Sequence, residues 1–255
     1  MLTKICMALL AGYVGYILLG VVATIIFRLR NPLYLVCRSE KVLYLTFDDG
    51  IDPRYTPRLL DLLEKHSIHA TFFVLASTVS RYPELLQRMK LEGHTVGLHS
   101  LDHKNQILQM PHSLCRDFRK CMEIFFMQDE KPVYYRPPWG HVTPLGLWLC
   151  KHYRLDVVLW TVIIGDWSKK ATVQSLCQKL RTKVHSSAVI CLHDGRGTDD
   201  APLRTIAALE TMIPRWKEEG YTFETISELF EKGAHERRAV YTGGCADLSD
   251  RICRF

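Results

Sequence analysis

The chain has 255 residues, of which 47% are hydrophobic and 24% charged, and its formal net charge at pH 7 is +6. This composition excludes an intrinsically disordered protein, and the sequence has no basic run interleaved with aromatic residues of the kind that binds nucleic acid. The length fits one large domain and a short additional segment.

The first element in chain order is an apolar segment from Ile5 to Phe27 that contains no charged residue. At about 1.5 Å per residue, a helix of this length crosses a hydrocarbon core of about 30 Å. The segment is longer than the apolar region of a secretory signal, and no small-residue cleavage site follows it. We therefore predict a retained single-pass transmembrane anchor over residues 5–27, in preference to a cleaved signal or a buried helix.

The orientation of this anchor is ambiguous from the sequence. Arg28, Arg30, Arg38 and Lys41 follow the span, whereas only Lys4 and the amino terminus precede it. The positive-inside rule would then leave the rest of the chain in the cytoplasm. Other features of the sequence favour the opposite side of the membrane, and the sequence leaves this conflict open.

Strands and helices alternate after residue 40. Strands are expected over residues 42–47, 70–75, 95–98, 133–135, 157–160 and 188–192, and helices over 57–66, 83–92 and 113–127, with further helical stretches between the later strands. This alternation predicts a parallel sheet built of βα units. We divide the chain into the anchor at 5–27, a linker at 28–40, one catalytic domain at 41–232 and a C-terminal tail at 233–255.

The nine cysteines are an odd number without Cys-x-x-Cys spacing, which argues against a zinc ribbon. Cys245 and Cys253, in the tail, would form a disulfide in an oxidising compartment. The large number of cysteines without an evident partner instead favours a reducing compartment. The sequence does not decide between these alternatives.

Polar residues gather at or just beyond the carboxyl ends of the predicted strands. They are Asp48, Asp49, His99, Arg136, Asp166 and His193. In a β/α barrel this edge carries the active site, so one pocket can collect all of them.

Two short motifs suggest a metal centre. If His99 and His103 lie on a helical turn, their spacing of four puts both imidazoles on one face, where they can bind one ion. Of the adjacent carboxylates, Asp49 can complete the ligand set while Asp48 stays free to remove a proton, and an open position remains for water. Each motif also has an ordinary interpretation, as surface histidines and as an Asp-Gly turn.

Two further segments can supply proton chemistry. His193 follows an apolar strand and titrates near neutrality, so it can donate a proton to a leaving group, although a buried histidine of the core fits the same pattern. Arg136, held by the stiff Pro137-Pro138 segment, is suited to orienting a carboxylate, although a surface ion pair fits it as well.

Taken together, five segments resemble the polysaccharide deacetylases, the NodB-homology enzymes of carbohydrate esterase family 4. The resemblance covers residues 41–230 and rests on Thr46–Gly50 (TFDDG), His99–His103 (HSLDH), Arg136–Gly140 (RPPWG), Asp166-Trp167 and Leu192–Asp194 (LHD). It implies a distorted β/α barrel that hydrolyses the N-acetyl group of an amino sugar.

The resemblance also implies a role for each motif residue. Asp49, His99 and His103 bind a divalent metal, usually zinc, with cobalt, nickel or manganese as alternatives. Asp48 is the general base and His193 the general acid, and these two are held by Arg136 and Asp166 respectively. The backbone N–H of Trp139 stabilises the oxyanion, and Trp167, Cys191 and Leu192 line the acetyl pocket.

Two positions depart from the family pattern. Ile163 stands where family members often have Asp, and Cys191 stands where many have Leu. These departures put the shape of the acyl pocket and the sugar preference in doubt. A thiol beside the metal would also make the enzyme sensitive to oxidation.

We therefore expect a membrane-anchored deacetylase of N-acetylglucosamine in peptidoglycan or a chitin-like polymer. One alternative is a deacylase of a lipid-linked amino sugar, and another is a non-catalytic sugar-binding barrel. The inferred partners are the glycan and the membrane. No nucleic-acid or protein partner is inferred.

Overall fold

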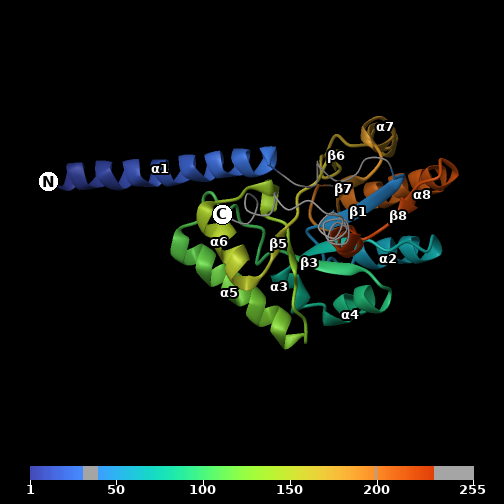
Figure 1. Ribbon diagram of the computed structural model, residues 1–255, viewed down its shortest axis with the longest axis horizontal. Coiled ribbons are helices and arrows are strands. Elements are labelled where there is room, and N and C mark those ends of the chain that lie inside the picture. The colour runs from blue at the N-terminus through green and yellow to red at the C-terminus, as the bar shows by residue number, and fades with distance from the viewer. Residues whose placement is uncertain (31–39, 199, 233–255) are drawn as a thin grey trace, which may run out of the picture.

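A computed structural model describes residues 1–30, 40–198 and 200–232 (Figure 1). The N-terminal apolar segment forms helix α1, Leu2–Leu29, which projects from the body of the molecule at its N-terminal end (Figure 1). Among the described residues, α1 is the one helix whose length and composition are sufficient to cross a membrane. Most of the linker, the tail and the expected Cys245–Cys253 disulfide lie outside the described residues.

The body of the molecule is an α/β domain around one parallel sheet. Its strands are β1 (Val42–Asp48), β2 (Thr71–Leu75), β3 (Thr95–Ser100), β4 (Tyr134–Tyr135), β5 (Asp156–Val157), β6 (Val162–Ile163), β7 (Ala188–His193) and β8 (Thr222–Phe223). They follow the order β5-β4-β3-β2-β1-β7-β6, and β8 pairs with the start of β1. Every residue of β1 is buried, as expected for a strand at the centre of a parallel sheet.

The two edge strands of the sheet are consecutive in the chain. β5 pairs with β4 and β6 pairs with β7, and only residues 158–161 separate β5 from β6. One segment thus pairs first with one edge and then with the other, which produces the predicted distorted β/α barrel. The single strand expected over residues 157–160 is corrected to these two short strands.

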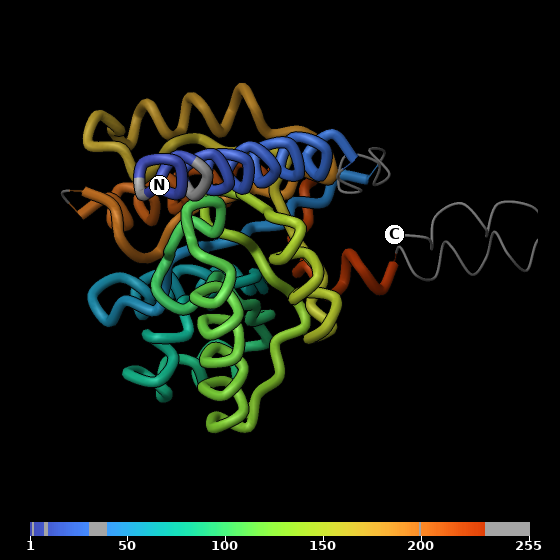
Figure 2. Tube along the Cα trace, turned by 90° about the vertical axis from the view of Figure 1, so that its left-hand side faces the viewer, coloured from blue at the N-terminus to red at the C-terminus, as the bar shows by residue number. Residues whose placement is uncertain are grey.

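The described residues form eight α-helices, and all of them except α1 flank the sheet (Figure 1 and Figure 2). Beyond α1 they are α2 (Thr56–Lys65), α3 (Ala76–Val79), α4 (Pro83–Leu91), α5 (Pro111–Met127), α6 (Pro144–Tyr153), α7 (Val173–Lys183) and α8 (Ala201–Glu218). Five of them have proline in the first turn, where its missing N–H costs nothing. Helix α7 begins with a capping box between Thr172 and Ser175.

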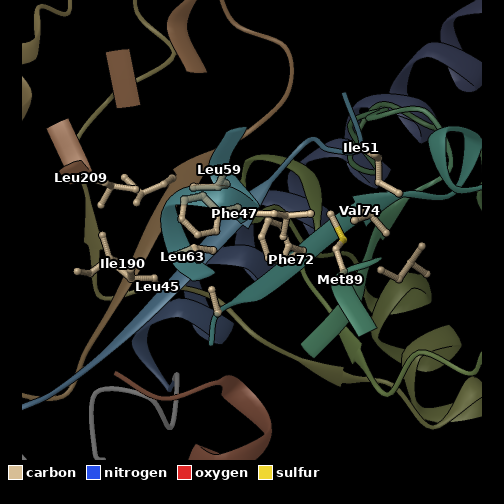
Figure 3. Packing of buried hydrophobic residues seen from close by; sticks show 14 of the residues in the cluster. Leu45, Phe47, Ile51, Leu59, Leu63, Phe72, Val74, Met89, Ile190 and Leu209 are labelled. Carbon is tan, nitrogen blue, oxygen red and sulfur yellow. The ribbon is translucent and has the colours of Figure 1, made fainter. Parts of the chain in front are cut away.

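The main core lies between the sheet and the helices on its outer face. Figure 3 shows Phe47 of β1 and Phe72 of β2 beside Leu59 and Leu63 of α2, and the two phenylalanine rings stack with centroids 5.2 Å apart. The leucines of α2 recur at helical spacing, so they form an apolar face that packs on the sheet. This packing fixes the carboxyl ends of β1 and β2, where the polar residues begin.

Candidate active site

One cavity of about 640 Å³ opens at the carboxyl ends of the strands. It is lined by Asp48, Asp49, His99, His103, Trp139, His141, Trp160, Ile163, Trp167, Cys191, His193, Arg196, Gly197 and Thr198. Asp48 is the last residue of β1 and pairs in register with His193, the last residue of β7. Strand register therefore brings together two residues that lie far apart in the sequence.

Asp49, His99 and His103 form a cluster that can hold a metal ion. The Nε2 atoms of His99 and His103 lie 3.4 and 3.2 Å from Asp49 Oδ1, and that oxygen is buried without a hydrogen-bond partner in the described part of the chain. One ligand atom from each of the three residues lies within 4.8 Å of the others. Three lone pairs that converge on one point fit a divalent cation with tetrahedral preference.

The protonation of this cluster also suits a cation. Burial would raise the pKa of Asp49, but its close contacts with the neighbouring imidazoles, that of His99 first, lower it to about 2. Burial lowers the pKa of His103 to about 4. At neutral pH the carboxylate is therefore ionised and the imidazole neutral, as metal ligation requires.

The local structure of the two histidines differs from the expected helical turn, which is corrected here. His99 lies in strand β3, and His103 lies in the following loop with a left-handed φ of 56°. The Ser100 hydroxyl accepts a hydrogen bond from His103 N–H and fixes this loop. His99 Nδ1 lies 2.7 Å from the carbonyl oxygen of Arg136 and donates to it, which leaves Nε2 free to face Asp49.

Asp48 lies beside the cluster with both carboxylate oxygens contacted. Arg136 Nη1 donates to Oδ1 at 2.8 Å, and the Cys191 thiol lies 3.4 Å from Oδ2. The guanidinium also donates to Thr46 Oγ1 and to the carbonyls of residues 158 and 159, and it is fully buried. Burial raises the pKa of the Cys191 thiol well above its usual range, so it stays protonated as a donor.

His193 and Asp166 form the second ion pair. Asp166 Oδ1 lies 2.9 Å from His193 Nδ1, and Oδ2 accepts from the His193 backbone N–H and from the Thr205 hydroxyl. Burial disfavours the imidazolium, but the charge and hydrogen bond of Asp166, together with the charges of Asp48 and Asp49, outweigh burial and raise the pKa of His193 to about 9. His193 is thus protonated at neutral pH and can donate a proton from Nε2.

Two tryptophans stand at the rim of the cavity. The Trp139 ring lies 4.3 Å from the ring of His103, and the Trp167 ring lies 5.0 Å from that of His193. Cys191 faces the cavity, but Leu192 lies in the hydrophobic core. The expectation for Leu192 needs correction, because neighbouring residues of a strand point to opposite faces.

Several cavity residues were not anticipated from the sequence. Arg196 Nε lies 3.8 Å from Asp49 Oδ2, and His141 Nδ1 contacts Asn105 Oδ1 at 3.2 Å. Asp194 is buried, accepts from the Thr56 hydroxyl, and burial raises its pKa to about 7. Asp194 does not line the cavity itself, but it lay inside a recognised motif, where its position next to His193 was the available signal.

Comparisons with known proteins agree with this geometry. A family model described as polysaccharide deacetylase matches residues 36–158. A peptidoglycan-N-acetylglucosamine deacetylase of Bacillus cereus is 34% identical over 196 residues, which cover 76% of this chain and 90% of that protein. The peptidoglycan-N-acetylmuramic acid deacetylase PdaA of Bacillus subtilis is 33% identical over 208 residues, with coverage of 79% and 76%. The chain belongs to the polysaccharide deacetylase family.

Solved structures give the same fold. The peptidoglycan deacetylase PdaC of Bacillus subtilis superposes with a TM-score of 0.70 at 31% identity, over 82% of this chain and all of that one. A pseudoenzyme of the same family from Bacillus anthracis superposes with a TM-score of 0.67 at 26% identity, over 76% of this chain and 66% of that one. The fold alone therefore does not establish catalysis, which has to be inferred from the residues of the site.

Proposed function

We propose that this protein is a metal-dependent N-deacetylase that releases acetate from N-acetylated amino sugars of cell-wall peptidoglycan. The observation that carries the proposal is the arrangement around the cavity. A cluster able to hold a cation lies between the carboxylate of Asp48 and the protonated imidazole of His193, which is the set of groups that hydrolysis of an amide requires.

The residues that would hold the metal are Asp49, His99 and His103, and we propose zinc, with cobalt, nickel or manganese as alternatives. A bound ion of this kind polarises the carbonyl group and lowers the pKa of water to about 7. Two imidazole nitrogens and a carboxylate suit zinc, which accepts nitrogen and oxygen ligands.

The remaining steps belong to residues of the chain. Asp48 accepts the proton of the attacking water at its carboxylate, and Arg136 orients that carboxylate through the contact of Nη1 with Oδ1. As the carbon–nitrogen bond breaks, His193 donates its Nε2 proton to the departing amine, and the products are acetate and the free amino sugar. Asp166 keeps His193 protonated until that step.

The walls of the cavity would bind the acetyl group. We propose that Trp167 and Cys191 enclose the methyl end and that the backbone N–H of Trp139 stabilises the oxyanion. Ile163, which replaces the Asp often found in the family, also lines the cavity and makes this side of it apolar.

We further propose that α1 anchors the enzyme in the cell membrane, with the catalytic domain outside the cytoplasm. The composition and length of α1 support the anchor, and the names of the relatives, which act on peptidoglycan, support the location. Labelling of single-cysteine variants in intact cells by an impermeant thiol reagent tests the orientation, and protection of the catalytic domain would contradict it.

One observation favours a second candidate, a lipid-linked amino sugar as substrate. The C-terminal half of α1 lies against the loop that borders the cavity, with Arg28 hydrogen-bonded to the Trp139 carbonyl. An anchor in this position would bring the cavity close to the membrane surface, where lipid-linked sugars reside.

Acetate release by the full chain, purified in detergent with zinc or cobalt, tests the proposal. We expect activity on peptidoglycan fragments or chitooligosaccharides, its loss after chelation, and its abolition in Asp48→Asn. Activity on a lipid-linked N-acetylated sugar alone would favour the second candidate. Glycan binding without acetate release, unchanged by chelation, would instead indicate a sugar-binding barrel.

A further inference from the structure

Three residues on one face of α1 contact the domain. Gly20, Thr24 and Arg28 are spaced by four, so they form a line along the helix. A side chain at Gly20 would lie 3.2 Å from both Ile107 Cγ1 and Thr143 Cγ2, so the helix can approach this closely only because glycine stands there. Small residues at this spacing allow a helix backbone to approach its neighbour closely.

Thr24 is the buried centre of this contact. It is 5% exposed in a helix whose side chains are mostly exposed. Its hydroxyl donates to the Val142 carbonyl and accepts from the Val142 N–H, both at 2.9 Å. One side chain thus satisfies both polar groups of a loop residue and fixes the backbone at that point.

Arg28 extends the contact to the rim of the cavity. Its Nη2 donates to the Trp139 carbonyl at 2.7 Å. Gly140 has a left-handed φ of 64°, and a side chain there would lie 2.9 Å from the same guanidinium nitrogen. The loop is therefore shaped to receive Arg28.

The loop that α1 holds is also part of the site. Trp139 adopts a left-handed φ of 56°, and its ring packs edge-on against His103 with centroids 4.3 Å apart. Contacts therefore run without a break from Thr24 and Arg28, through residues 139–142, to a residue of the cation cluster.

We propose that α1 supports the loop of residues 139–142, which borders the active site, and that Thr24 and Arg28 are positioning residues that hold Trp139 against His103. This inference rests on the proposed function, because the position of Trp139 affects a rate only if the cavity is catalytic. It requires that α1 is retained, since cleavage as a signal would remove every one of these contacts.

The test uses the full chain in lipid nanodiscs, loaded with cobalt(II). Thr24→Val and Arg28→Ala remove the hydrogen bonds with little change in helix propensity, and Thr24→Ser and Arg28→Lys restore a donor. The matched control is Arg30→Ala, because Arg30 is exposed and its side chain has no hydrogen bond to another described residue. The measurements are kcat and KM for acetate release, the visible spectrum of cobalt(II), and hydrogen exchange of residues 139–143.

We expect the double variant Thr24→Val/Arg28→Ala to lose about tenfold in kcat/KM, mostly in kcat, since displacement of an active-site group by about 1 Å can cost up to 100-fold. The cobalt(II) spectrum should change and exchange in residues 139–143 should accelerate, while the conservative variants and Arg30→Ala resemble the wild type. An unchanged spectrum and kcat/KM in the double variant, or an equal loss in Arg30→Ala, would overturn the inference.

The two proposals fail in different ways. A wild-type protein that releases no acetate from any N-acetylated sugar contradicts the proposed function. Hydrogen exchange and the cobalt(II) spectrum would still report whether α1 positions the loop. Intact mass of the protein from membranes adds a further check, because a chain that begins after residue 30 overturns the role of α1.

Discussion

The two halves of the cavity differ in how completely their polar atoms are paired. On the cation side, Asp49 Oδ1 and His103 Nδ1 are buried without hydrogen-bond partners in the described part of the chain. On the proton side, both oxygens of Asp48 and both oxygens of Asp166 have partners within the protein. The cation side thus leaves a buried carboxylate oxygen available to a ligand, whereas the carboxylates of the proton side are paired within the protein.

Because of this difference, the polar residues of the two sides should contribute differently to the stability of the fold. An unsatisfied buried polar atom costs about 1–3 kcal/mol, which a bound cation would recover. A buried ion pair behaves otherwise, because removing one partner leaves an uncompensated charge. Substitutions on the cation side should therefore affect binding and rate more than folding, whereas those on the proton side should affect both.

The largest expected effect is that of His103→Ala on activity. Loss of one ligand should lower kcat/KM by at least about a thousandfold, because the metal contributes several kcal/mol to the transition state. The metal-free protein should lose only about 1 kcal/mol of unfolding free energy or less, as His103 Nδ1 has no partner to lose. Thermal unfolding with and without zinc measures both, and equal stabilisation of variant and wild type by zinc would contradict the cation site.

Arg136→Met should produce the largest loss of stability. The fully buried guanidinium holds Asp48 and Thr46, and its removal leaves a buried carboxylate unpaired at a cost of about 3–5 kcal/mol. Urea unfolding measures this loss. The double variant Arg136→Met/Asp48→Asn should be more stable than the sum of the single effects predicts, because it removes the unpaired charge. A loss below about 1 kcal/mol in Arg136→Met would refute the buried pair.

Asp166→Asn should shift the pH dependence of activity. Against the effect of burial, the charge and hydrogen bond of Asp166, with smaller contributions from Asp48 and Asp49, raise the pKa of His193 to about 9, and the protonated form is the proposed acid. Activity is therefore present below this pKa and is lost as the pH rises through it. Without the carboxylate, the alkaline limb of kcat/KM should move down by about 1–2 pH units, the usual effect of one nearby opposite charge. Asp61→Asn is the control, because Asp61 is exposed on the outer side of α2. An alkaline limb that does not move in Asp166→Asn would count against His193 as the acid.

The sequence predicts the fold and the membership of the site better than it predicts local geometry. Polar residues after β1, β3 and β7 meet because parallel strands end at one edge, which follows from strand order alone. The spacing of His99 and His103 indicated a helix, but Ser100 and the left-handed residue His103 form a loop that achieves the same convergence. Spacing fixes how far apart two ligands can lie and leaves the backbone between them undetermined.

Contacts made by loops and by α1 could not be predicted in this way. Arg196 and His141 belong to loops without periodicity, so no pattern placed them at the cavity. Gly20 and Thr24 counted only as uncharged residues of an apolar span, although their spacing also fits a packing face. Leu192 shows the converse, because assigning a whole motif to the cavity ignored the alternation of strand β7.

The smallest expected effect is that of Thr205→Val, which tests one hydrogen bond on the proton side of the cavity. The Thr205 hydroxyl donates to Asp166 Oδ2 at 3.0 Å, and valine keeps the shape without the donor. Unfolding free energy should fall by about 1 kcal/mol, the usual value of one buried hydrogen bond. Because Asp166 becomes more basic without this donor, it holds the His193 proton more firmly, and the alkaline limb of kcat/KM should rise by a few tenths of a pH unit. Thr211→Val on the same helix, where the hydroxyl bonds only its own helix, is the matched control. A downward shift, like that of Asp166→Asn, would mean that Thr205 supports the geometry of the pair and not its charge.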